Sequence, residues 1–109
     1  DELIHVPIAR IWYFEACNQY VRLHVGKVSY LISTESLASL EAKTDASTFF
    51  RVHRGALVNA NFVEAIYLAR GHGRSLKLSD GRRLPVSRRN SVALDKLAIT
   101  LAERKFGSR

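Results

Sequence analysis

Apolar and polar residues alternate in several short segments of the chain, and such alternation is typical of β-strands that bury one face. Residues 10–15 and 20–25 are rich in aromatic and branched side chains, which favour strands. Gly26 and Lys27 then provide a turn into a third apolar segment, residues 28–32. The pattern predicts that these three strands form an antiparallel meander.

The strand pattern continues through the middle and the late part of the chain. Three further short extended segments are separated by polar breaks, and they cover residues 49–52, 56–58 and 62–68. Asp80-Gly81 lies between residues 74–79 and 82–86. An Asp-Gly pair between two strand-like segments is a strong hairpin signal because both central positions tolerate positive φ.

Helical patterns occur at two places. Ser33 and Thr34 offer N-cap hydroxyls, and Glu35 adds a negative charge that the helix dipole favours. We therefore predict a short helix over about residues 35–43. Ser87 caps a final helix, and one stripe at helical spacing is expected to face the core: Asn90, Leu94, Leu97, Ala98 and Leu101.

Together these elements predict the fold class and the domain organisation. We expect one mostly β domain of small antiparallel sheets, with one short internal helix and a C-terminal helix. A length of 109 residues fits a single domain over residues 1–109. The predicted core covers about residues 4–101, and the two ends have the character of cut points or tails, so we expect a piece of a longer chain.

Charge narrows the class of partner. The chain has 17 Lys and Arg residues against 10 Asp and Glu residues, which gives a formal net charge of +7. Within residues 70–90 Asp80 is the single acid, whereas the basic residues are Arg70, Arg74, Lys77, Arg82, Arg83, Arg88 and Arg89. Such a field attracts DNA, RNA or an anionic membrane. The alternative interpretation is a face that only keeps the domain soluble.

Several classes of protein are disfavoured. The chain shows no apolar run of about 18 residues and no leader typical of a signal peptide. Cys17 is the single cysteine, which excludes an internal disulfide and favours the cytoplasm. Gly71-His72-Gly73 lacks the ending of a phosphate-binding P-loop and fits a flexible hairpin loop better.

Catalysis and metal binding are also disfavoured. The four histidines are far apart and have no paired cysteines beside them, so neither a metal site nor a cofactor is expected. No nucleophile elbow is recognisable, and the ten acids are scattered. We therefore expect a binding module and not an enzyme.

Three polar clusters remain as candidate DNA contacts. The first contains Asn18, Gln19, Tyr20 and Arg22, at a turn into a strand. Asn and Gln can pair with adenine through two hydrogen bonds, whereas Tyr and Arg can reach phosphate. An ordinary polar turn is the alternative for this cluster.

The second cluster lies in the polar breaks between the middle strands and contains His53, Arg54 and Asn59. Arginine is the commonest reader of guanine, through O6 and N7. A structural role is the alternative for His53, and Asn59 is equally suited to form a turn.

The third cluster opens the last helix and contains Ser87, Arg88, Arg89 and Asn90. The free N–H groups at a helix start favour an anion such as phosphate. Two arginines at this end oppose the helix dipole, which indicates a reason for their presence other than helix stability. Their alternative is a solvated helix end.

The residues in these clusters belong to a longer string that resembles one family, the LytTR domain. The resemblance runs from about Ile4 to Leu101 and rests on Tyr13-Phe14-Glu15-Ala16, Asn18-Gln19-Tyr20-Val21, the string from Phe50 to Asn59, Leu78-Ser79-Asp80-Gly81 and the string from Leu84 to Arg89. It implies an elongated fold of short strands in three small sheets, whose loops enter the DNA grooves. The contacting loops would be residues 18–22, a second loop centred on Arg54 and a third on Arg88 and Arg89.

The resemblance also implies the setting of the domain. It would be the output domain of a bacterial transcription regulator, C-terminal to a phosphorylation receiver or, less often, to a membrane segment. Its partner would be double-stranded DNA, and the small reading surface favours two copies on two similar elements. Membrane contact is expected only if the longer chain has a membrane segment.

Two other functions compete with DNA binding. A basic protein-interaction or membrane-surface domain would need a large apolar patch or a basic amphipathic helix. An esterase or nuclease would need clustered acids or a nucleophile–base pair. Because the arginines gather at one end of the last helix, sequence-specific DNA binding is the leading hypothesis.

Overall fold

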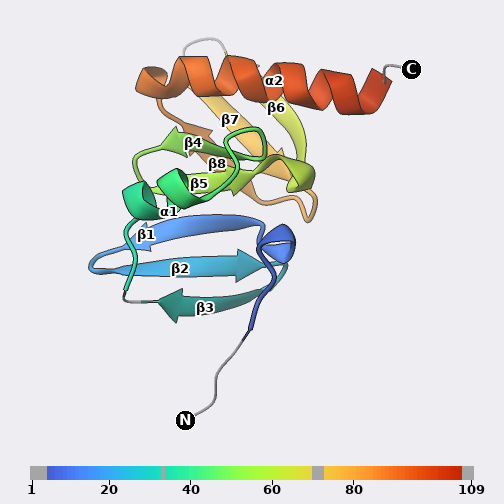
Figure 1. Ribbon diagram of the computed structural model, residues 1–109. Helices are drawn as coiled ribbons and strands as arrows, with labels where there is room; N and C mark the ends of the chain where they lie inside the picture. Colours follow the sequence, from blue (N-terminus) through green and yellow to red (C-terminus); the bar gives the residue numbers. More distant parts are fainter. Residues whose placement is uncertain (1–4, 33, 70–72, 107–109) are drawn as a thin grey trace.

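Figure 1 shows the computed structural model, which describes residues 5–32, 34–69 and 73–106. Two antiparallel sheets are present in this part of the chain, with strand orders β3-β2-β1-β5-β4 and β6-β7-β8. The strands are β1 (Tyr13–Cys17), β2 (Tyr20–Val25), β3 (Val28–Ile32), β4 (Phe49–His53), β5 (Ala56–Asn59), β6 (Val63–Ala69), β7 (Gly73–Leu78) and β8 (Arg83–Val86). The mostly β fold class is confirmed.

Two α-helices and three short 3-10 turns complete the described chain. The helices are α1 (Leu37–Lys43) and α2 (Ser91–Phe106), and the turns are η1 (Ile8–Arg10), η2 (Ala60–Phe62) and η3 (Arg88–Asn90). The molecule measures 46 × 36 × 26 Å along its principal axes, so it is longer in one direction than in the others. Helix α2 lies across one end of this shape, and β3 lies at the other (Figure 1).

The predicted meander is confirmed as β1, β2 and β3. Its register places Glu15 opposite Arg22, and Arg22 opposite Leu31. The first strand starts at Tyr13, whereas the sequence pattern predicted residue 10. The reason is the 3-10 turn η1, in which the Arg10 N–H donates to the Pro7 carbonyl at 2.9 Å.

The resemblance implied three small sheets, and this number was wrong for the described residues. Strand β1 pairs with β2 on one side and with β5 on the other, so the meander and the β4–β5 hairpin form one sheet. Tyr13, for example, lies opposite both His24 and Val58. This continuous sheet holds the turn after β1 and the turn after β4 in a fixed relation.

The hydrophobic core lies on both faces of the five-stranded sheet. On one face α1 covers the sheet, in a cluster of Ile11, Phe14, Val21, Leu23, Leu37, Leu40, Phe49 and Leu57. The other face packs against the second sheet and α2, in a larger cluster that includes Phe50, Val52, Val58, Leu76, Leu78, Leu94 and Leu97. The sheet is therefore buried on both sides along β1, β4 and β5.

Both predicted helices exist, with corrections at their ends. Helix α1 is capped by Ser36, whose Oγ accepts from the Ser39 N–H at 3.0 Å, and not by Thr34. Ser33 lies outside the described residues. In α2, Leu94 and Leu97 are buried and Leu101 packs against the core, but Ala98 is exposed. The buried stripe is centred between Leu94 and Leu97, which places Ala98 on its flank.

The hairpin at Asp80-Gly81 is confirmed as β7 and β8, but its turn differs from the predicted two-residue turn. Only Gly81 has a positive φ there, of 94°. The Gly81 N–H donates to the Leu78 carbonyl, and the Leu78 N–H donates to the Arg82 carbonyl. The predicted loop at Gly71-His72 and the basic Arg70 lie outside the described residues, as does the start of the predicted core at Ile4.

Candidate nucleic-acid interface

The three predicted contact regions lie along one side of the molecule. These regions are the β1–β2 turn, the β4–β5 turn and the start of α2, all at the left of Figure 1. The Ala16 N–H donates to the Gly55 carbonyl at 2.9 Å, which joins β1 to the second turn. The Ser87 N–H donates to the Val52 carbonyl at 2.8 Å, which joins the start of the helix to β4. Backbone hydrogen bonds therefore fix the three regions relative to one another.

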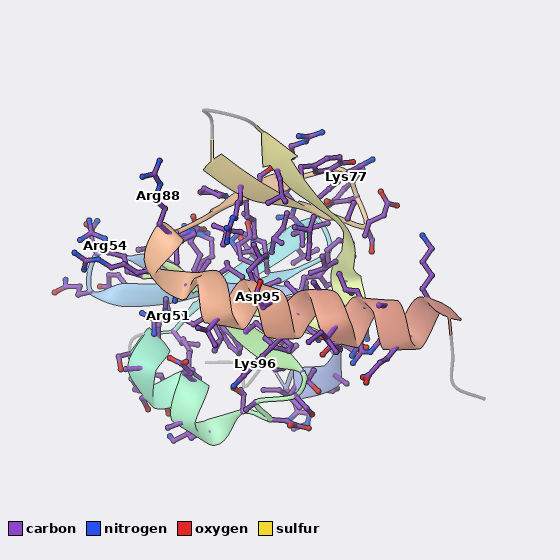
Figure 2. All side chains as sticks on the ribbon, turned by 90° about the horizontal axis from the view of Figure 1, so that it is seen from above. Arg51, Arg54, Lys77, Arg88, Asp95 and Lys96 are labelled. Carbon is purple, nitrogen blue, oxygen red and sulfur yellow. The ribbon has the colours of Figure 1, made fainter. Side chains whose placement is uncertain are left out.

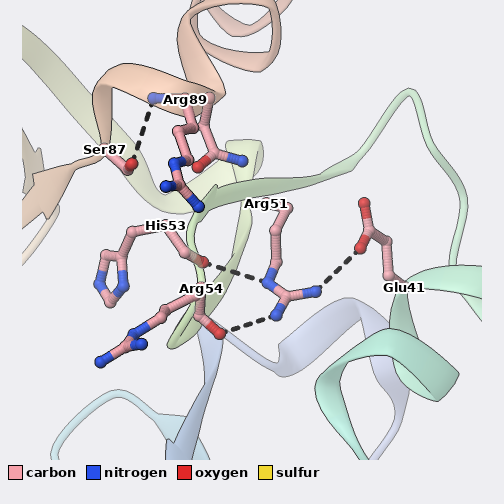
Figure 3. Close-up of a pocket in the computed structure, with 7 residues that line it drawn as sticks. Glu41, Arg51, His53, Arg54, Ser87 and Arg89 are labelled. Carbon is pink, nitrogen blue, oxygen red and sulfur yellow. Dashed lines mark hydrogen bonds and ion pairs between the residues drawn. The ribbon is translucent and has the colours of Figure 1, made fainter.

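An open pocket of about 740 Å³ lies between the second and third regions. Figure 3 shows the side chains that line it, which are Glu41, Arg51, His53, Arg54, Ser87, Arg89 and Asn90. The pocket brings together His53 and Arg54 from one predicted cluster with Ser87 and Arg89 from another. Glu41 and Arg51 were absent from the predicted clusters, although Arg51 lies in the string from Phe50 to Asn59 that carries the family resemblance.

His53 is held in one orientation by its own turn. The Gly55 N–H donates to His53 Nδ1 at 2.9 Å. Partial burial lowers the pKa of His53 below its ordinary value, and the nearby Arg51 and Arg54 lower it further, against an opposing effect of Glu15. The ring is therefore neutral near pH 7, and because Nδ1 accepts, its proton lies on Nε2.

Arg88 and Arg89 belong to η3, the short 3-10 turn that lies immediately before α2. Ser87 Oγ accepts from the Arg89 N–H at 3.2 Å, so the predicted capping serine acts on this turn. Arg88 is not in the pocket. Figure 2 shows that it projects from the same side of the molecule as Arg54. The backbone at Arg54, Arg88 and Arg89 is held in place by the hydrogen bonds between β1, β4 and the start of the helix.

The first predicted cluster divides into two parts. Asn18, Gln19 and Tyr20 are exposed at the β1–β2 turn, where Asn18 adopts a left-handed φ of 57°. Arg22 instead lies within β2, is partly buried and donates from Nη1 to Ser29 Oγ at 3.1 Å. The turn residues are free to contact a partner, whereas Arg22 lies on the face of the sheet. None of the four lines the pocket.

Asn59 was predicted as a contact residue, and the structure corrects this. Its side chain is completely buried. Nδ2 donates to the Ile11 carbonyl and Oδ1 accepts from the Asn61 N–H, both at 2.9 Å. Asn59 therefore ties the chain before β1 to the end of β5, and it is not available to a partner.

The basic residues late in the chain serve different purposes. Arg82 is directed inward, with its guanidinium 5.4 Å from the Tyr13 ring centroid and bonded to the Gly26 carbonyl. Lys77 pairs with Glu64, and Arg83 stacks on Tyr67. The positive charge predicted from composition is thus partly structural, and Arg88 and Arg89 are the late arginines at the candidate interface.

Within the described ranges, no three His, Cys, Asp or Glu side chains gather in a way that could hold a metal ion. The same part of the chain contains no helix that is long and apolar enough to span a membrane. Cys17 is a free, partly buried thiol.

A small β domain with arginines at fixed turns on one side has the character of a domain that contacts a polyanion through its loops. The family model of the LytTr DNA-binding domain matches residues 1–98, so the chain belongs to this family. The resemblance predicted from the sequence is confirmed.

Two relatives illustrate the match. The sensory transduction protein LytT of Bacillus subtilis (strain 168) is 30% identical over 97 residues, which cover 89% of this chain and 40% of that protein. The chain thus spans about two fifths of the length of this relative. A solved LytTr DNA-binding domain from Bacillus cereus aligns with a TM-score of 0.78 and 28% identity, over 87% of this chain and 86% of that one.

Proposed function

We propose that this domain binds a specific sequence of double-stranded DNA and serves as the output domain of a bacterial transcription regulator in the cytoplasm. The observation that carries the proposal is the convergence of Arg54 and Arg89 on one pocket from two separate elements. Arginines at fixed positions can bind guanine through two hydrogen bonds. The role is binding, without catalysis.

The other exposed residues on this side have complementary parts in the proposal. Arg88 lies outside the pocket and is suited to phosphate, which fixes the domain on the duplex but carries no sequence information. Asn18 and Gln19 have amide side chains that can read adenine in the groove. Tyr20, with an exposed fraction of 41%, can reach the sugar-phosphate backbone beside them.

His53 contributes one donor in this arrangement. Its Nδ1 is occupied by the Gly55 N–H, so only the Nε2 proton is available to a base or a phosphate. A single neutral donor next to Arg54 adds one directional hydrogen bond to the interface without adding charge. This use of His53 requires its ring to stay in the orientation that the turn imposes.

Two copies on two similar DNA elements are part of the proposal. One domain of this size covers only about 600–1,000 Å² of a DNA interface, judged by single modules of other families. Regulators with so small a surface gain discrimination when two copies occupy one face of the duplex. We propose that the second copy is held by DNA or by other parts of the longer protein.

Selection of bound sites from random duplexes, followed by titration of the recovered site and a scrambled duplex, tests the proposal. Arg54→Ala and Arg89→Ala should each lose roughly 1–3 kcal/mol on the recovered site and relax its base preference. The matched control is Lys105→Ala, which removes an exposed charge at the opposite end of α2. Recovery of no common sequence, or equal losses in all three variants, would refute sequence-specific reading.

A further inference from the structure

Arg51 sits behind the β4–β5 turn and contacts its backbone. Its Nε donates to the His53 carbonyl at 3.1 Å, and its Nη2 donates to the Arg54 carbonyl at 2.7 Å. The remaining nitrogen, Nη1, donates to Glu41 Oε1 at 3.0 Å. Figure 3 shows the three bonds spreading from one guanidinium group to two peptide groups and to the carboxylate on α1.

These bonds set the direction of the peptide groups in the turn. In a planar trans peptide the C=O and the N–H point in opposite directions. Because the Arg54 carbonyl points at Arg51, the Gly55 N–H of the same peptide points away from it. That N–H donates to His53 Nδ1. The guanidinium of Arg51 thereby orients the ring of His53 through the backbone.

The same two peptides flank Arg54. With the carbonyls of His53 and Arg54 both held by one planar group, the Cα–Cβ direction of Arg54 is fixed between them. The side chain of Arg54 therefore leaves the backbone in a fixed direction at the pocket that it lines, which favours bidentate reading of a base.

The guanidinium group of Arg51 already binds acceptors within the protein. All three of its bonded nitrogens have protein acceptors, and its side chain is only 21% exposed. Three of its five N–H groups donate to the protein, so a phosphate could use only the other two and would compete with Glu41 for the charge. Arg51 is therefore distinguished from Arg54, Arg88 and Arg89, although all four lie on the same side of the molecule.

We propose that Arg51, anchored by Glu41, is a positioning residue that sets the base preference of the domain by orienting His53 and Arg54, without touching DNA itself. This inference rests on the proposed function. It makes helix α1, which carries Glu41, part of the apparatus that determines which sequence is bound. A lysine cannot replace Arg51, because a single ammonium does not reproduce the fork that spans two carbonyls and a carboxylate.

Arg51→Lys and Glu41→Gln test the inference in the complete domain. For each variant, the dissociation constants for the selected site and for a scrambled duplex are measured over a series of salt concentrations. Arg51→Lys should reduce the ratio of specific to non-specific affinity roughly tenfold. Glu41→Gln, which leaves both carbonyl bonds in place, should reduce it by about threefold. Arg51→Gln removes the charge, and in this variant the slope of log affinity against log salt on the scrambled duplex should stay unchanged, whereas a lost phosphate contact would lower its size by about 0.9.

Matched controls come from the other sheet, where Lys77 Nζ pairs with Glu64 Oε1 at 3.1 Å. Lys77→Gln and Glu64→Gln break an ion pair of similar exposure and should keep the affinity ratio. The ¹⁵N resonances of the His53 ring give a second measurement, because weaker donation from the Gly55 N–H should shift the Nδ1 signal in Arg51→Lys and not in Lys77→Gln.

Each outcome bears on one proposal. If the parent domain prefers no sequence, the proposed function fails before any variant is made. If the parent is selective and Arg51→Lys keeps its full ratio, the positioning role of Arg51 is overturned while the proposed function stands. A salt slope reduced by about 0.9 in Arg51→Gln would show that Arg51 contacts phosphate directly and would also overturn it.

Discussion

Arg82 joins the hairpin of the second sheet to the first sheet, and its removal gives a sharp test of how the fold is stabilised. Its Nη2 donates to the Gly26 carbonyl at 2.6 Å. The guanidinium carbon lies 5.7 Å from the Trp12 ring centroid and 5.4 Å from that of Tyr13. Arg82→Ala removes these contacts and the ion pair between Arg82 Nε and Asp80 Oδ2, and it leaves the Gly26 carbonyl without this charged donor.

The expected loss follows from the separate contacts. A hydrogen bond from a charged donor contributes about 1.5–3 kcal/mol when buried, and each cation–π contact about 0.5–1 kcal/mol near a surface. The side chain is 32% exposed, so solvent reduces both contributions. We expect Arg82→Ala to lower the free energy of unfolding by about 2–3 kcal/mol.

Thermal unfolding followed by circular dichroism measures this loss. Unfolding entropy is about 2.1 cal/mol/K per residue, or roughly 0.23 kcal/mol/K for a chain of 109 residues. A loss of about 2–3 kcal/mol therefore lowers Tm by roughly 9–13 °C.

Arg83→Ala is the matched control for net charge. Arg83 is the next residue in the chain. Its guanidinium carbon lies 4.2 Å from the Tyr67 ring centroid, on the outer face of the second sheet. Its removal takes away the same charge but should cost under about 1 kcal/mol. Equal changes in Tm for the two variants would show that Arg82 acts only through net charge, and a change below about 2 °C for Arg82→Ala would refute the role of the contacts.

Three further predictions concern the core, pH and spacing. Asn59→Ala should lower the free energy of unfolding by about 2–4 kcal/mol in denaturant titrations, because the buried Ile11 carbonyl and Asn61 N–H each lose a partner; an unchanged midpoint would contradict this. Burial lowers the pKa of both His24 and His53 below 6.5, so near and below this pH the unfolded chain binds more protons than the folded domain. Tm should therefore fall as pH drops from about 7 to about 5, and a constant or rising Tm would contradict this prediction. Inserting about five base pairs between two DNA elements should abolish cooperative binding by the longer regulator and about ten should restore part of it, whereas equal affinity at all spacings would make one domain the functional unit.

Local patterns predicted most of the elements because strands, turns and caps are encoded over a few residues. The alternation in residues 20–25 and the Asp80-Gly81 pair both identified their strands. The pairing of β1 with β5 was not predictable in this way, because it joins residues more than 40 positions apart in the sequence and leaves no periodic signal. The number of sheets, which the resemblance implied, was wrong because this pairing joins the meander and the β4–β5 hairpin into one sheet.

In the candidate site, residue type alone singled out some of the side chains, and their contact with DNA stays a prediction. Arg54 and Arg89 were predicted as contacts, and the fold brings both to one pocket. Arg51 was missed because two of its partners are backbone carbonyls and the third, Glu41, lies ten positions earlier on a separate element. Asn59 was misjudged because residue type does not show that its amide is buried between the Ile11 carbonyl and the Asn61 N–H.

The turn after β4 tolerates few substitutions at Gly55. A Cβ at this position would lie 3.1 Å from His53 Cε1 and would push against the ring, although the backbone there has an ordinary φ. At Gln19 and Arg54, by contrast, exposed side chains leave from a backbone that the sheet fixes. Under the proposed function, exchange of a few turn side chains would change the bound DNA sequence while the framework stays constant. A substitution at position 55 would change it indirectly, by turning the His53 ring.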